Sequence, residues 1–128
     1  MDCKLFDSEL RLMELLWEHP AEETPLTARD VSLIAAQRIG WNKNTTYTVI
    51  KKLIDKGAIR REEPNFHCIP LITRGEVQRQ EARSLLQKLF GGSKKALLSS
   101  LLEDESLTAE DVAELRSLID KAPGKAVN

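Results

Sequence analysis

An amphipathic helix followed by a glycine and two short strand-like runs constrains the fold of this chain more than any other feature. Residues 41–61 read WNKNTTYTVIKKLIDKGAIRR, and one set of side chains recurs at helical spacing, as in a helix buried along one stripe. Gly57 then ends the helix, as glycine does where the backbone needs a positive φ. The next residues, AIRREE, PNF and HCIPLI, read as strand, turn and strand. The predicted buried stripe consists of Thr46, Val49, Ile50, Leu53 and Ile54.

The opposite face of this helix is polar and basic. Residues 43–61 carry six basic side chains and one acidic side chain, a net charge of +5 in a chain whose total is −1. Neutralising DNA phosphates needs positive charge on one surface, and short polar side chains at a helix start approach base edges closely. The pattern therefore favours a DNA-recognition helix over a merely solvated face, which is the alternative for a basic helix taken by itself. The face comprises Asn44, Thr48, Lys51 and Asp55, flanked by Thr45, Tyr47 and Lys52.

Two further helices are predicted before the recognition helix. Asp7 is expected to cap the first, which ends before Pro20, and Thr27 caps the second, with Asp30 in a capping-box position. Three helices followed by a hairpin form the winged variant of the helix-turn-helix, whose third helix enters the major groove. The first helix is expected to bury an arc made of Leu10, Leu12, Met13, Leu15, Leu16 and Trp17.

Two other places are predicted to contact the DNA backbone. The amides that begin the second helix, around Thr27 and Arg29, suit a phosphate, although an equally good account is that Thr27 only caps. Arg60 and Arg61 alternate across the first strand of the wing, so at most one of them faces the duplex. Because residues 62–67 at the tip are not basic, we expect a weak backbone contact there.

The C-terminal part of the chain is predicted to form three helices that begin after Thr73, Ser93 and Thr108. Each exposes a leucine-rich stripe that a short helix cannot bury on the basic domain alone, so a second copy of the chain is the simplest cover. Residues 101–120 carry seven acidic side chains and one basic side chain, a net charge of −6, which favours a position away from DNA, although a merely soluble surface fits nearly as well. The predicted dimerisation residues are Leu85, Leu86, Leu89, Phe90, Leu97, Leu98, Leu101, Leu102, Val112, Leu115, Leu118 and Ile119.

The expected architecture is mainly α with a small β-hairpin. It divides into a winged helix-turn-helix domain over residues 1–72, a three-helix dimerisation region over residues 73–122 and a disordered tail over residues 123–128. No run of about 18 apolar residues and no signal-peptide pattern occurs, so a cytoplasmic location is expected.

Catalytic and metal-binding functions are not expected. The two histidines and two cysteines are scattered, no histidine stands three or four residues from a cysteine on a common helix, and no nucleophile or phosphate-loop motif occurs. In a reducing compartment two distant cysteines are more often ordinary residues than a disulfide or metal site. We therefore predict no enzyme activity, no metal and no cofactor.

Three segments, ELRLMELLW, WNKNTTYTVIKKLIDKGAI and ARSLLQKLFGGSKKALLSSLLEDESLTAEDVAELRSLID, together resemble the penicillinase and methicillin-resistance repressor family, which also contains copper-responsive repressors. The resemblance runs from about Asp7 to Lys121. It implies a homodimeric winged-helix repressor that binds a palindromic operator and controls antibiotic-resistance genes and its own operon. By position it assigns DNA contacts to Asn42, Lys43, Asn44, Thr45, Tyr47, Thr48 and Lys52.

The chain departs from the family pattern in three places. In antibiotic-responsive members a membrane sensor with a zinc protease domain brings about cleavage between an asparagine and a phenylalanine. The aligned pair here is Ser100 and Leu101, which puts release by the same protease in doubt. Tyr47 stands where the family has a basic residue, which puts the operator sequence in doubt. The paired Cys-x-Cys motifs of the copper-responsive members are absent, which disfavours copper sensing.

The leading hypothesis is therefore a dimeric transcriptional repressor whose partners are double-stranded DNA, a second copy of itself and, through the resemblance, a membrane sensor protease. One alternative is a winged-helix module that binds a protein and no DNA, which a basic helix face buried against the C-terminal helices would favour. Another is a small-ligand-responsive regulator, for which an apolar cavity between the domains would be the sign.

Overall fold

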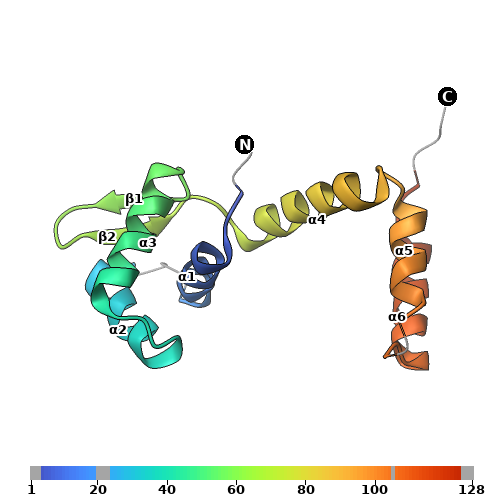
Figure 1. Ribbon diagram of the computed structural model, residues 1–128, viewed down its shortest axis with the longest axis horizontal. Helices are drawn as coiled ribbons and strands as arrows, with labels where there is room; N and C mark the ends of the chain where they lie inside the picture. Colours follow the sequence, from blue (N-terminus) through green and yellow to red (C-terminus); the bar gives the residue numbers. More distant parts are fainter. Residues whose placement is uncertain (1–3, 20–23, 105, 125–128) are drawn as a thin grey trace. The chain divides into compact units, whose positions relative to one another are not determined.

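The computed structural model describes residues 4–19, 24–104 and 106–124. Its elements follow in the order α1 (Asp7–Glu18), α2 (Ala28–Arg38), α3 (Lys43–Asp55), β1 (Ile59–Glu62), β2 (His67–Pro70), α4 (Arg74–Phe90), α5 (Lys94–Leu102) and α6 (Ala109–Lys121). The predicted fold class, mainly helical with one two-stranded antiparallel hairpin, is confirmed (Figure 1).

The chain divides into two compact units, residues 1–82 and residues 83–128, so the division falls inside α4. The assignment of DNA binding to residues 1–72 and of dimerisation to residues 73–122 stays a prediction. Within the expected disordered tail, residues 125–128 lie outside the described residues.

The N-terminal unit packs α1, α2 and α3 around one apolar core, with the hairpin beside α3 (Figure 1). The predicted stripe of α3 turns inward, since Thr46, Val49, Ile50 and Leu53 are buried and Ile54 is partly buried. Gly57 has a φ of 80°, which confirms the predicted stop. The fully buried side chains at the centre of the core include Leu12, Met13, Val31, Ile50, Leu53 and Ile59.

Two predictions for α1 are wrong, namely its N-cap residue and the burial of Leu10. Phe6 occupies the N-cap, and Asp7 is the first residue of the helix. The Phe6 side chain has no oxygen and caps none of the first-turn amides, but the backbone N–H of Phe6 donates to Glu9 Oε1 at 2.8 Å. The Glu9 side chain is buried, with 1 % exposure. Leu10, which the sequence places in the apolar arc, is 36 % exposed instead.

The hairpin is joined to the start of α2 by pairing that the sequence did not suggest. Strands β1 and β2 pair antiparallel, from Ile59 opposite Pro70 to Glu62 opposite His67. On the other edge of β2, the Cys68 amide donates to the Leu26 carbonyl at 2.8 Å. The start of α2 is therefore tied to the hairpin that follows α3.

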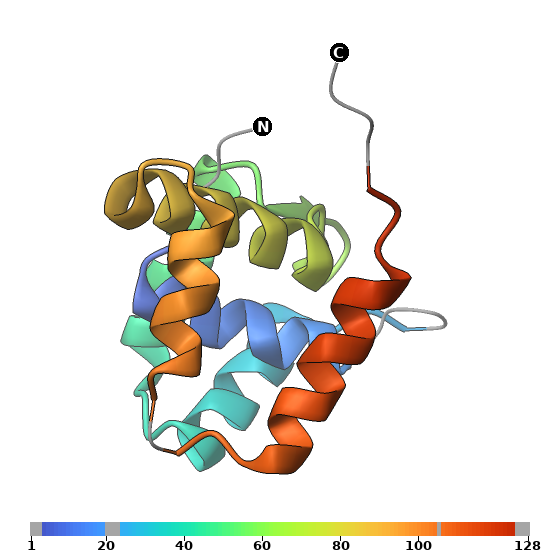
Figure 2. The ribbon, with the colours of Figure 1, turned by 90° about the vertical axis from the view of Figure 1, so that its right-hand side faces the viewer.

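In the C-terminal unit the predicted helix starts are confirmed at two caps. The Ser93 hydroxyl accepts from the Ala96 amide at 3.1 Å, and Thr108 forms the reciprocal capping pair with Asp111 at 3.0 Å in each direction. Helices α5 and α6 diverge from the segment that joins them (Figure 2), and neither contains a buried residue. Their stripes are only partly covered within this unit: Leu101, Leu102, Leu118 and Ile119 are exposed, and Leu97, Leu98, Val112 and Leu115 are partly buried.

Candidate nucleic-acid interface

The outward face of α3 brings together the side chains that the sequence assigned to DNA. Within the N-terminal unit this face is open, because Asn44, Thr48 and Lys51 are all exposed. Among the other assigned residues, two are partly buried, namely Tyr47 and Thr27. The remaining assigned residues are exposed: Asn42, Lys43, Thr45, Lys52, Arg29, Arg60 and Arg61.

The first turn of α3 divides its polar side chains between capping and exposure to solvent. Asn42 caps the helix, since its Oδ1 accepts from the Thr45 amide at 2.8 Å. Thr48 donates its hydroxyl hydrogen to the Asn44 carbonyl at 2.8 Å, which leaves the hydroxyl oxygen as an acceptor. In the described part of the chain the Asn44 side chain has no hydrogen-bond partner, so both its donor and its acceptor face solvent. An asparagine amide of this kind matches the N6 and N7 edge of adenine.

Only half of the six cations between residues 43 and 61 remain without a carboxylate partner. Among the described residues, Lys51 and Lys52 form no ion pair, and the Lys43 ammonium lies 5.7 Å from the centroid of the Tyr47 ring. Lys56 points the other way, since its Nζ contacts Glu9 Oε1 at 2.6 Å and donates to the Lys4 carbonyl at 2.9 Å. The count of basic residues by sequence therefore overstated the charge available for phosphates.

The two arginines of the wing are each paired with a carboxylate two residues further on. Arg60 contacts Glu62 at 2.9 Å, and Arg61 donates from Nε to Glu63 Oε1 at 2.6 Å. The Arg61 hydrogen bond, together with the Phe66 amide, holds the pKa of the Glu63 carboxyl below its usual value. The wing is thus close to neutral, in keeping with the weak backbone contact expected there.

The start of α2 offers fewer free amides than its sequence suggests. The Thr27 amide donates to Asp30 Oδ2 at 3.0 Å, and the Thr27 hydroxyl accepts from the Asp30 amide at 3.1 Å, which confirms the predicted cap. The Ala28 amide donates to the Phe66 carbonyl at 2.9 Å. The Arg29 amide remains as a donor for a phosphate, beside an exposed Arg29 side chain that has no ion pair among the described residues.

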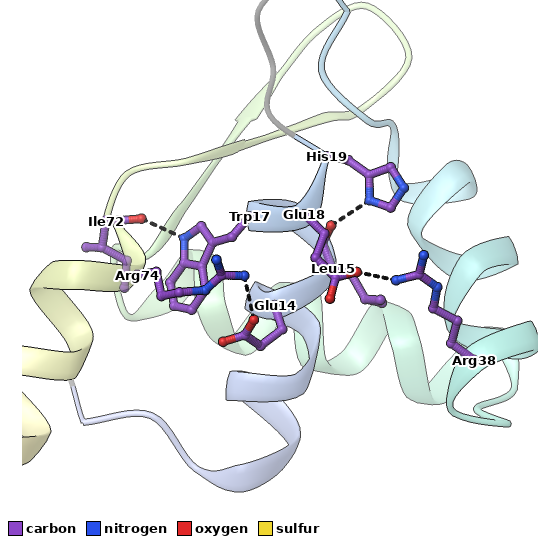
Figure 3. A network of polar contacts seen from close by, with 8 residues as sticks. All are labelled: Glu14, Leu15, Trp17, Glu18, His19, Arg38, Ile72 and Arg74. Atoms are coloured by element: carbon purple, nitrogen blue, oxygen red, sulfur yellow. Dashed lines mark hydrogen bonds and ion pairs between the residues drawn. The ribbon is translucent and has the colours of Figure 1, made fainter. Parts of the chain in front are cut away.

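A second group of polar contacts joins α1 to its neighbours in the N-terminal unit (Figure 3). Trp17 Nε1 donates to the Ile72 carbonyl at 3.0 Å, which fixes the segment before α4 on the end of α1. Arg74 donates to Glu14 at 2.7 Å, and this carboxylate raises the pKa of the Arg74 guanidinium. These contacts hold the first turn of α4 on α1 and leave the face of α3 untouched.

The thiol chemistry of the described residues gives no sign of a reactive or metal-bound cysteine. Burial raises the pKa of the Cys68 thiol to about 11, so the group is protonated at neutral pH. Cys3 lies outside the described residues. Across the described ranges, no three His, Cys, Asp or Glu side chains lie close enough to hold a metal ion.

Within the same ranges, none of the helices combines the length and the apolar character that crossing a membrane requires.

The predicted dimerisation residues line helices that bury little within one chain. Leu89 in α4 is 71 % exposed and Leu118 in α6 is 66 % exposed. Ser100 and Leu101, the pair aligned with the family's cleavage site, are both exposed in α5.

Comparison with known proteins places the whole arrangement in one family. A family model described as penicillinase repressor matches residues 5–121. The chain is 23 % identical over 120 residues to the penicillinase repressor of Bacillus licheniformis, covering 92 % of this chain and 91 % of that protein. It is 24 % identical over 126 residues to the methicillin resistance regulatory protein MecI of Mammaliicoccus sciuri, covering 94 % and 99 %. The penicillinase repressor of Staphylococcus aureus is 23 % identical over 115 residues, with 88 % of each chain covered.

Proposed function

The chain belongs to the penicillinase repressor family, a family of DNA-binding transcriptional repressors without enzymatic activity, and from this premise we propose that it binds a palindromic operator as a homodimer through α3. The names of its relatives, a penicillinase repressor and a methicillin resistance regulator, support control of antibiotic-resistance genes. Control of its own operon is part of the same proposal. The observation that carries the proposal is the solvent-exposed face of α3, where Asn44, Lys51 and Lys52 have no polar partner among the described residues.

We assign different DNA contacts to the side chains of α3 according to the hydrogen-bonding and charged groups that remain unengaged within the protein. Asn44 and Thr48 near the helix start read base edges, while Lys51 and Lys52, one turn later, neutralise phosphates. Asn42 contributes chiefly by capping the helix, because its side-chain oxygen is already engaged with the Thr45 amide at 2.8 Å. Arg29 and Arg61 supply further backbone contacts on either side.

The homodimer is supported by the uncovered leucines of the C-terminal unit. Exposed apolar patches of this kind mark interaction sites, and a closed twofold dimer lets the same stripe cover its own copy. A dimer also gives the two equivalent helices that a palindromic operator requires.

Relief of repression is proposed to follow a signal that separates the two copies. Proteolysis by a membrane sensor protease at the exposed Ser100–Leu101 pair is one route, and this pair differs from the asparagine and phenylalanine of the family's cleavage site. Helix α5 has only nine residues, and isolated helices of that length are marginal in water, so its backbone can unwind into a protease site. Cleavage there would cut the leucine stripe of α5, separating Leu97 and Leu98 from Leu101 and Leu102.

The phosphate contacts are tested by replacing Lys51 and Lys52 together with alanine. Each lost phosphate contact lowers the slope of log affinity against log salt by nearly one unit, so a dimer that loses up to four should lose up to about 3.5 units. A mobility-shift titration over several salt concentrations, using DNA from upstream of the protein's own gene, measures this slope. The matched control is the exposed pair Lys94 and Lys95 in α5, whose replacement by alanine should leave the slope unchanged. Equal slopes for both variants would reject the phosphate assignment.

Base reading is tested at Asn44. The Asn44→Ala variant should lose about 1 to 3 kcal/mol of operator binding per contact and much less binding to random DNA, because only the operator presents the matching base edge. Parallel titrations of operator and random duplexes at one salt concentration give both values. An equal loss on the two duplexes would show that the Asn44 side chain contacts the backbone or nothing.

A further inference from the structure

Phe66 stands at the tip of the wing in a conformation that bulky residues seldom adopt. Its φ is 51°, and Asn65 before it has a φ of 70°. The left-handed region is a common place for asparagine but an outlier for a large aromatic residue, and it persists where surrounding contacts impose it. The contacts of Phe66 therefore show what this turn is built around.

The side chain of Phe66 joins the wing to the recognition helix. The Arg61 guanidinium carbon of β1 lies 3.8 Å from the centroid of the Phe66 ring, within cation–π distance. The Tyr47 ring of α3 meets the same ring edge to face, with centroids 6.1 Å apart and planes at 90°. With Lys43 against the outer side of Tyr47, the row Lys43, Tyr47, Phe66 and Arg61 runs from the start of α3 to the wing.

The backbone of Phe66 joins a third element to the same point. Its carbonyl accepts from the amide of Ala28, the first residue of α2, at 2.9 Å. Its own amide donates to Glu63 Oε2 at 3.3 Å, and Glu63 Oε1 accepts from Arg61 at 2.6 Å. One residue thus contacts α2, α3 and the wing, the three elements that carry all the proposed DNA contacts.

We propose that Phe66 is a positioning residue, which touches no base itself but sets the angle of the wing and of the α2 start against α3. The inference rests on the proposed function. It identifies the residue that holds the three parts of the proposed DNA-binding surface in a fixed arrangement. Both ring contacts need a π system, because a cation is attracted to the ring face and an aromatic edge to the ring quadrupole. A leucine of similar bulk fills the space without either attraction. Tyr47 then acts mainly through its contact with Phe66.

The test compares DNA binding by the full-length wild type and by the Phe66→Leu variant over a series of salt concentrations. We expect operator affinity to fall about tenfold and random-DNA affinity less than threefold. The salt slope should change by well under one unit per protomer, because Arg61 is already paired with Glu63 at 2.6 Å. Phe66→Tyr, which keeps the ring, should restore both values. The matched control is Phe6→Leu, since Phe6 also lies under a cation, with Lys56 Nζ 4.3 Å from its ring centroid, but far along the chain from the wing.

A double-mutant cycle separates positioning from simple stability. Arg61→Ala alone should reproduce part of the loss of operator affinity, and the double variant with Phe66→Leu should lose less than the sum of the two single losses, because both remove the same contact. A Phe66→Leu variant that keeps the wild-type operator affinity overturns the inference, whatever its melting temperature. If that variant does not fold, Tyr47→Leu removes the α3 side of the contact, and an unchanged operator preference there overturns it equally. Absence of binding by the wild type at about 50 mM salt would instead reject the proposed function.

Discussion

The Lys56→Met variant is expected to unfold with a free energy lower by about 3 kcal/mol or more than that of the wild type. Glu9 is 1 % exposed, and its Oε1 contacts the Lys56 ammonium at 2.6 Å, while its buried Oε2 has no hydrogen-bond partner among the residues that the structure describes. Removing one member of a buried ion pair typically costs about 3 to 5 kcal/mol, because an uncompensated charge is left inside. The Lys56 side chain is 29 % exposed, which favours the lower end of that range.

Urea unfolding followed by tryptophan fluorescence measures this loss, since Trp17 and Trp41 both pack against the core of the N-terminal unit. The matched control is Lys52→Met, which removes an exposed and unpaired cation from the last turn of the same helix and should change stability by less than about 0.5 kcal/mol. The double variant Glu9→Leu with Lys56→Met should recover most of the loss, because no buried charge remains. If the Lys56→Met protein were as stable as the Lys52→Met control, the Lys56–Glu9 ion pair would not stabilise the fold, and the prediction would be wrong.

The second large effect is expected in the C-terminal unit, where aspartate replaces both Leu85 and Leu89 on one stripe of α4. These side chains are 44 % and 71 % exposed in the single chain. If a second copy covers them, each change removes about 1.5 to 3 kcal/mol of apolar burial and adds a charge to the interface. The dimer dissociation constant should then rise at least about 100-fold.

Sedimentation equilibrium over a range of concentrations measures that constant, and operator titrations should show the matching loss of affinity. Ser84→Asp places the same charge on an exposed neighbouring position of α4 and serves as the control. A doubly substituted protein that stays dimeric at the concentrations where the control is dimeric would exclude this stripe from the interface. If the doubly substituted protein stayed dimeric but lost DNA binding, the substitutions would act on the DNA-binding unit and not on the dimer interface.

Features that depend on neighbours in sequence could be predicted from the sequence. The caps at Thr27, Ser93 and Thr108 need only a side chain and an amide three residues away, and the stripe of α3 follows from helical spacing alone. The stop at Gly57 needs only a local positive φ. These are interactions whose partners lie on the same turn of the chain.

Features that depend on tertiary partners could not be predicted. Glu9 and Lys56 are 47 residues apart, so nothing near either one shows that Lys56 leaves the basic face to pair with a buried carboxylate. The pairing of the α2 start with the hairpin, through Cys68 and Leu26, also joins residues far apart in the sequence. Even the short-range ion pair of Arg61 and Glu63 does not follow from the sequence. Alternation along a strand predicts which face of the strand a side chain occupies, but it does not predict its partner on that face.

The near-neutral wing also bears on how such a repressor would locate its target within a genome. Arg60 and Arg61 are each paired with a carboxylate two residues away, so they displace few counterions from the phosphates of an arbitrary duplex. DNA of unrelated sequence therefore holds the protein only briefly. A small number of copies then suffices to keep one control region occupied, because fewer of them are sequestered on the vast excess of other DNA.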